Sequence, residues 1–112
     1  MLTIEGLREY GANVDEGVAR CANNEMLYLK LIPKLIGDEG FDELAELILE
    51  RDYEKAFEVA HRLKGAAANL SMTPIEEPIT RISDSLKVKE ERDYSEDLKQ
   101  VRQAVQALSA LQ

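Results

Sequence analysis

The only histidine of this 112-residue sequence, His61, has neighbours that suit nucleophilic chemistry. Lys64 and Gly65 follow it at i+3 and i+4, so on a helix all three residues share one face. Histidine is largely neutral near pH 7, and its ring nitrogens can attack an electrophile. A lysine one turn away can neutralise an incoming phosphoryl group, whose transfer depends mainly on positioning and electrostatics. The three residues therefore indicate a site that could accept a phosphoryl group.

The helix that carries these residues has a distinct apolar stripe. At about 100° per residue, the stripe is about 100° wide. Its members are Ala56, Val59, Ala60, Leu63, Ala67 and Leu70. His61 lies roughly 140° and Gly65 roughly 180° from its centre, so we expect both to face solvent with Ala68, at i+7. Arg62 turns away from this group and is predicted to be a surface residue.

Each of these residues also has a simpler interpretation. A lone histidine or lysine on a helix surface usually has no special role. Gly65 could let another helix pack closely, but its direction away from the apolar stripe argues against this. A glycine inside a helix costs about 1 kcal/mol relative to alanine, which suggests a need for close approach by a partner. The occurrence of His61, Lys64 and Gly65 together on one helix face favours a functional site.

The run from Ala60 to Leu70, AHRLKGAAANL, resembles the signature of the histidine phosphotransfer (HPt) domains of two-component phosphorelays. The signature fixes a histidine, then Leu-Lys-Gly, then small residues ending in an aliphatic one. The sequence departs from the family at Ser71, where many members have glycine. Because Ser71 follows the predicted helix, this departure concerns how the helix ends and not the histidine.

The resemblance implies a role for each residue of the face. His61 would be the phosphoacceptor, through Nε2, and would exchange the phosphoryl group with an aspartate of response-regulator receiver domains. Lys64 would stabilise the phosphoryl oxygens. Gly65, Ala68 and Phe57 would contact the receiver. The receiver would supply Mg²⁺, so no cofactor is expected in this chain, and a hybrid histidine kinase could be a further partner.

The composition limits the other classes of function. The sequence is 45% hydrophobic and 32% charged, which is typical of a folded domain. Its net charge of −8 argues against nucleic acids and anionic membranes as partners, because such contacts need clustered Lys and Arg. Cys21 is the only cysteine, so no intramolecular disulfide and no thiolate metal cluster can form. The lack of a secretory signal and of a long apolar run predicts a cytoplasmic protein, which we expect to be a monomer.

Helical periodicity extends over nearly the whole sequence, and no stretch alternates like a strand. Ile4 and Leu7 predict a short first helix that ends at Gly11. Asn13 and Glu16 form a capping box for a second short helix. Its expected inward residues are Val14, Val18 and Cys21.

A third helix should begin after Asn23 or Asn24, with Pro33 inside it. Its expected apolar residues are Leu27, Tyr28, Leu31, Ile32, Leu35 and Ile36. The run from Gly37 to Gly40 interrupts the pattern, which resumes over residues 41–48. The sequence leaves open whether residues 24–51 form one kinked helix or two.

The second half of the sequence predicts three longer helices. Asp52 is the expected N-cap of the helix that carries His61 and runs to about Leu70. Thr73 as N-cap and Pro74 at N1 predict the start of the next helix. Its expected buried residues are Ile75, Ile79, Ile82 and Leu86. After a charged loop over residues 87–92, a last helix should bury Tyr94, Leu98, Val101, Val105 and Leu108.

The predicted fold is all-α: an antiparallel four-helix bundle with short additional N-terminal helices, in a single domain over residues 1–112. Because the sequence has no glycine-rich phosphate loop, we expect it to have no ATP site and not to be a kinase on its own. The family resemblance implies a phosphoryl carrier instead. The alternative is a non-catalytic acidic helical adaptor that binds a protein partner. The phosphoacceptor domain of a chemotaxis-type histidine kinase shares the motif, but dimerisation and catalytic domains should accompany it, and the sequence contains none.

Overall fold

The computed structural model describes all 112 residues and consists of seven helices with no strand. In chain order they are α1 (Ile4–Tyr10), α2 (Val14–Arg20), α3 (Glu25–Ile36), α4 (Gly40–Leu49), α5 (Tyr53–Asn69), α6 (Thr73–Lys87) and α7 (Ser95–Ser109). The predicted all-α class is confirmed. None of the helices is both long and apolar enough to cross a membrane.

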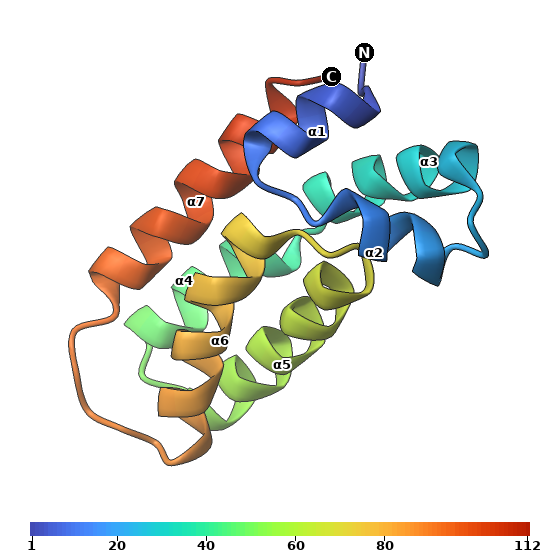
Figure 1. Ribbon diagram of the computed structural model, residues 1–112. Helices are drawn as coiled ribbons and strands as arrows, with labels where there is room; N and C mark the ends of the chain where they lie inside the picture. The colour runs from blue at the N-terminus through green and yellow to red at the C-terminus, as the bar shows by residue number, and fades with distance from the viewer.

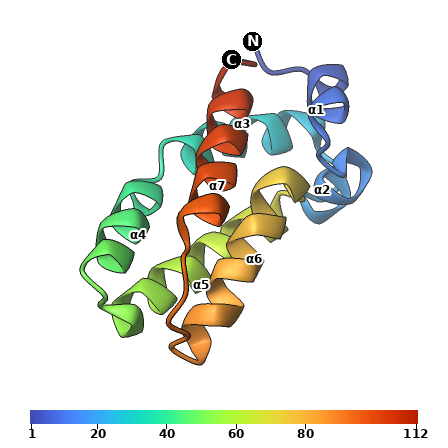
Figure 2. The same cartoon turned by 90° about the vertical axis from the view of Figure 1, so that its left-hand side faces the viewer.

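Helices α4 to α7 form a bundle, and α1 to α3 gather at one end of it (Figure 1). Helix α5 packs against α4 and α6, and α6 also packs against α7. Helix α3 lies across the end of the bundle, where it contacts α7 (Figure 2). Short connections make consecutive bundle helices antiparallel. The predicted four-helix bundle with additional N-terminal helices is therefore confirmed.

One hydrophobic core joins the bundle to the N-terminal helices. It includes Leu7 of α1, Val14 of α2 and Tyr28 of α3 together with Leu63 of α5. The completely buried Tyr28 donates a hydrogen bond from its hydroxyl to the carbonyl oxygen of Leu70 at 2.9 Å. The N-terminal helices therefore hold the C-terminal end of α5 in place.

Three of the predicted helix starts are confirmed, and one is shifted. Asn13, Asn24 and Asp52 each accept a hydrogen bond from the backbone N–H three residues later, at 3.4, 3.1 and 3.3 Å. Helix α6 begins at Thr73 itself, so the prediction that Thr73 is the N-cap was wrong by one residue. Met72 takes the N-cap position and is completely buried. Packing of its side chain in the core outweighs the preference of threonine for the cap.

Residues 24–51 form two helices, α3 and α4, and not one kinked helix. The Asp38 side chain accepts a hydrogen bond from the backbone N–H of Gly40 at 2.8 Å, at the start of α4. Helix α3 buries Tyr28, Ile32 and Leu35, whereas Leu27 is 39% exposed. Because α3 lies across the bundle end, only a narrow stripe of it is covered.

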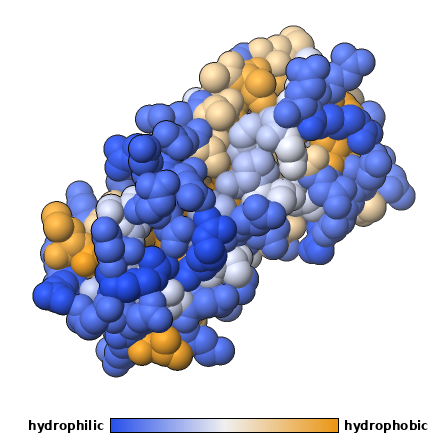
Figure 3. All heavy atoms as spheres, turned by 60° about the vertical axis from the view of Figure 1, so that its left-hand side comes forward, coloured by the Kyte–Doolittle hydropathy of each residue, from blue (hydrophilic) through white to orange (hydrophobic).

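Hydrophilic side chains cover most of the surface seen in Figure 3, and apolar atoms form separate patches. The most exposed large hydrophobic residues are Met1, Met26, Leu49 and Val88. None of them belongs to α5. The face of α5 that carries His61 is therefore not part of a large apolar patch.

Candidate functional site

Helix α5 fixes the direction in which His61 points. The helix runs for 17 residues from its Asp52 cap to Asn69. Its completely buried residues are Ala56, Ala60, Leu63 and Ala67. Val59 is half-buried at the margin of this stripe, whereas His61 and Gly65 are exposed. The apolar stripe predicted from the sequence does face the core, and the imidazole projects away from it.

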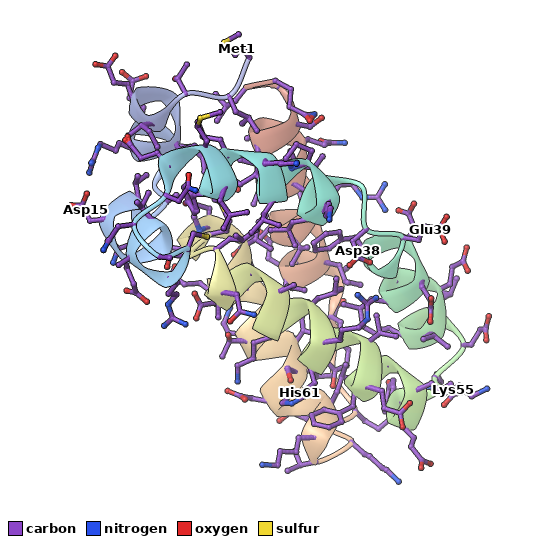
Figure 4. The ribbon with its side chains drawn as sticks, turned by 90° about the vertical axis from the view of Figure 1, so that its right-hand side faces the viewer. Met1, Asp15, Asp38, Glu39, Lys55 and His61 are labelled. Atoms are coloured by element: carbon purple, nitrogen blue, oxygen red, sulfur yellow. The ribbon has the colours of Figure 1, made fainter.

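The ring of Phe57 lies beside the imidazole of His61. The two ring centroids lie 5.6 Å apart with an angle of 27° between the planes, which is a stacked arrangement. His61 takes part in none of the ion pairs and in none of the side-chain hydrogen bonds near α5. Its ring nitrogens are therefore open to a partner. In Figure 4, His61 projects from one side of α5, while Asp38 and Glu39 lie beyond the other side.

Lys64, Gly65 and Ala68 follow His61 at i+3, i+4 and i+7 and so lie on the same face of α5. Lys64 is half-buried and has no carboxylate partner. A Cβ atom placed on Gly65 would meet no other atom within 4 Å, so this glycine serves no internal packing contact. Ala68 is half-buried. The helix therefore presents a nucleophile beside an unpaired cation and a gap in its side-chain cover.

Arg62, next to His61 in the sequence, has a structural partner that the sequence did not reveal. Its guanidinium donates hydrogen bonds to both carboxylate oxygens of Asp38, at 2.7 and 3.2 Å. These bonds lower the pKa of Asp38 below its ordinary value, against the opposing effect of partial burial. Gly40 makes room for this pair, because a Cβ there would collide with the guanidinium. Arg62 is exposed, as predicted, and its side chain also ties α5 to the start of α4.

The main hollows of the protein lie away from His61. The groove between α4 and α7 has a volume of about 180 Å³ and is lined by residues such as Phe41, Leu44 and Val101. No group of three or more His, Cys, Asp or Glu side chains is placed to hold a metal ion. His61 instead lies on an open helix surface, where a reaction requires a partner that encloses the imidazole.

One family model matches most of the chain, including α5. The family model described as Hpt domain matches residues 37–111, which include the whole of α4 to α7. The chain belongs to the Hpt domain family. No curated protein and no solved structure matches it. The resemblance predicted from residues 60–70 is thereby confirmed, and α1 to α3 lie outside the matched span.

Membership of the family establishes the general activity. The chain contains a histidine phosphotransfer domain of two-component phosphorelay signalling, and domains of this family act as phosphoryl carriers. Its partners are proteins of such relays. The stacking of Phe57 on His61 was not predicted, although the i, i+4 spacing of the two aromatic side chains could have suggested it.

Proposed function

We propose that His61 accepts a phosphoryl group from, and returns it to, an aspartate of response-regulator receiver domains. The observation that carries this proposal is the arrangement on α5: the only histidine is exposed, and Gly65 beside it meets no other atom. The site lies inside the span that the Hpt model matches. No other residue of the chain can form a phosphohistidine.

The transfer reaction needs few groups from this chain. A ring nitrogen of His61, through Nε2 in our proposal, attacks the phosphorus of the aspartyl phosphate. The N–P bond forms as the P–O bond to the aspartate carboxylate breaks, and the imidazole proton passes to solvent. Lys64 holds the phosphoryl oxygens by charge. The receiver supplies Mg²⁺ and the acidic pocket, so the carrier binds no cofactor of its own.

Small side chains around His61 let the receiver come close. Gly65 and Ala68 add almost no bulk to the face, and Phe57 supplies an apolar contact at its edge. The partner must enclose the imidazole, because none of the main hollows of the chain does so. A receiver domain, whose phosphorylated aspartate lies in its own pocket, meets this requirement. A hybrid histidine kinase that contains such a receiver is a further candidate donor.

We also propose that residues 1–112 act as one unit and as a monomer. The N-terminal helices share the hydrophobic core with the bundle, and Tyr28 bonds the end of α5. The net charge of −8 opposes contact with nucleic acids and anionic membranes.

The test is transfer from a receiver domain that has been phosphorylated with acetyl phosphate. We expect acid-labile phosphate on the wild-type chain and none on His61→Gln, with equal circular dichroism spectra for the two proteins. Label that persists in His61→Gln would exclude the assignment. Stable binding of the receiver to the wild-type chain without any transfer would favour an acidic adaptor instead.

A further inference from the structure

Phe57 is fixed on one side and touches the imidazole on the other. It lies one helical turn before His61 and is half-buried, packed against the hydrophobic core. Its ring stacks on the imidazole with 5.6 Å between centroids and 27° between planes. Because the core restrains Phe57, the aromatic ring is a rigid surface against which His61 rests.

No side-chain hydrogen bond or ion pair holds the imidazole in this orientation. A metal-binding or catalytic histidine is commonly oriented by a hydrogen bond to one ring nitrogen. His61 has no such bond from the side chains around α5. A Cβ atom placed on Gly65 would have no side-chain atom of His61 within 4 Å. The imidazole therefore lies toward Phe57 and away from Gly65.

Rotamer preferences indicate how far the imidazole would lose its orientation without this contact. A helical side chain has two main χ1 wells, and the ring torsion of histidine is broad and roughly two-fold. An imidazole without the stack would spread over about four orientations. In-line phosphoryl transfer requires one of them, because the attacking nitrogen must point at the phosphorus.

We propose that Phe57 is a positioning residue for phosphotransfer: its ring holds the His61 imidazole in the orientation that reacts. This inference rests on the proposed function of His61. It is distinct from contact of Phe57 with the receiver, because a docking contact sets the concentration of receiver needed for half-maximal rate, whereas orientation sets the rate at saturation.

The test compares Phe57→Leu and Phe57→Tyr in the full chain. Leucine keeps an apolar side chain for docking but removes the ring, whereas tyrosine keeps the ring. With a receiver domain phosphorylated by acetyl phosphate, we expect Phe57→Leu to lower kcat by about 3- to 10-fold, in line with the loss of orientation, and to change KM less than twofold. Phe57→Tyr should restore kcat. Phe41→Leu, which removes the other phenylalanine of the chain on α4, is the matched control and should leave kcat and KM unchanged.

A second readout needs no phosphotransfer. With one histidine in the chain, the two carbon-bound imidazole protons give one pair of NMR signals. The stacked ring of Phe57 should shift these signals upfield in the wild type and in Phe57→Tyr, but not in Phe57→Leu. Circular dichroism checks that each variant is folded.

The outcomes separate the two proposals. A normal kcat in folded Phe57→Leu, or a raised KM with unchanged kcat, would overturn the positioning role. Equal imidazole signals in the wild type and in Phe57→Leu would overturn it as well. Phosphate on His61→Gln would instead overturn the proposed function, and the NMR comparison would still decide whether Phe57 orients the ring.

Discussion

Arg62 and His61 are neighbours in the sequence, yet they have opposite surroundings on α5. Arg62 donates two hydrogen bonds to Asp38, which also accepts one from the backbone of Gly40. His61 and the nearby Lys64 have no such partners. The polar groups on one flank of the helix are paired within the chain, whereas His61 and Lys64 on the other flank are unpaired. This contrast predicts which substitutions should affect stability and which should affect transfer.

The largest effect on the open flank is expected from Gly65→Gln. The new side chain would extend into empty space, so the fold should unfold at the wild-type temperature or above it. The receiver, however, would be held away from His61, and a misplacement of about 1 Å can cost about 100-fold in rate. Thermal melts and transfer kinetics on one preparation measure both effects.

Gly65→Ala is the matched control for bulk. It should stabilise the domain by about 0.5–1 kcal/mol, because alanine favours the helix, and should retain most of the transfer. A strongly destabilised Gly65→Gln would show that this glycine serves helix packing after all, and that the flank is not open.

Lys64→Ala should have the next largest effect. Removal of the unpaired ammonium should lower the transfer rate by roughly 10- to 100-fold, which corresponds to about 1.4–2.7 kcal/mol of transition-state stabilisation. The melting temperature should hardly change, because Lys64 makes no ion pair that the substitution would break. Single-turnover transfer with the phosphorylated receiver measures the rate. An unchanged transfer rate would show that Lys64 is only a solvated surface residue.

Ser71 also has an unpaired polar group, but this group is buried and cannot contact a partner protein. Its hydroxyl has no hydrogen-bond partner within the protein, and the residue is only 3% exposed, so no partner can reach it. Its φ of 54° lies in the left-handed region, which favours glycine. We expect Ser71→Gly to raise stability by about 1 kcal/mol, or roughly 4 °C in Tm, by relief of both costs. Phosphotransfer should be unchanged, and a slower transfer would contradict this view.

The smallest effect is expected on the paired flank. Arg62→Ala should cost at most about 1 kcal/mol, as for other exposed ion pairs, and should leave transfer unchanged. The pair lowers the pKa of Asp38, so its stabilising effect is present above the ordinary aspartate value of 3.8 and is lost as the pH falls through the lower folded value. The free energy of unfolding, measured with urea, should therefore differ between wild type and Arg62→Ala by more at pH 7 than in acid. A large loss of transfer would place Arg62 in the site.

Local sequence signals predicted most of the fold. The caps at Asn13, Asn24 and Asp52 depend on residues three positions away, and the apolar stripe of α5 depends on residues within a few turns. The start of α6 was missed by one residue because the burial of Met72, a tertiary effect, decided it. The apolar positions of α3 did not show which of them would be buried, because the packing of α3 across the bundle leaves Leu27 exposed.

The geometry of the candidate site was also predictable where it depends on residues close together in the sequence. The outward direction of His61 and the open space at Gly65 follow from helical geometry alone. The Arg62–Asp38 pair joins residues 24 positions apart, and neither residue carries a local signal that names the other. Ser71 was noted only as a departure from the family, and its backbone conformation gives the physical reason why glycine is favoured there.

The position of His61 along α5 has an energetic consequence for the carrier. It lies eight residues after Tyr53 and eight before Asn69, or about 12 Å from each end of the helix. The helix macrodipole acts on charges mainly within the first and last turns, where it would strongly stabilise or repel a phosphate dianion. At the midpoint the two ends cancel, so a phosphoryl group on this imidazole is neither trapped nor expelled by the helix. In the proposed transfer, the energy of the phosphorylated state is therefore set by the imidazole, the lysine and the docked receiver, and not by the helix dipole.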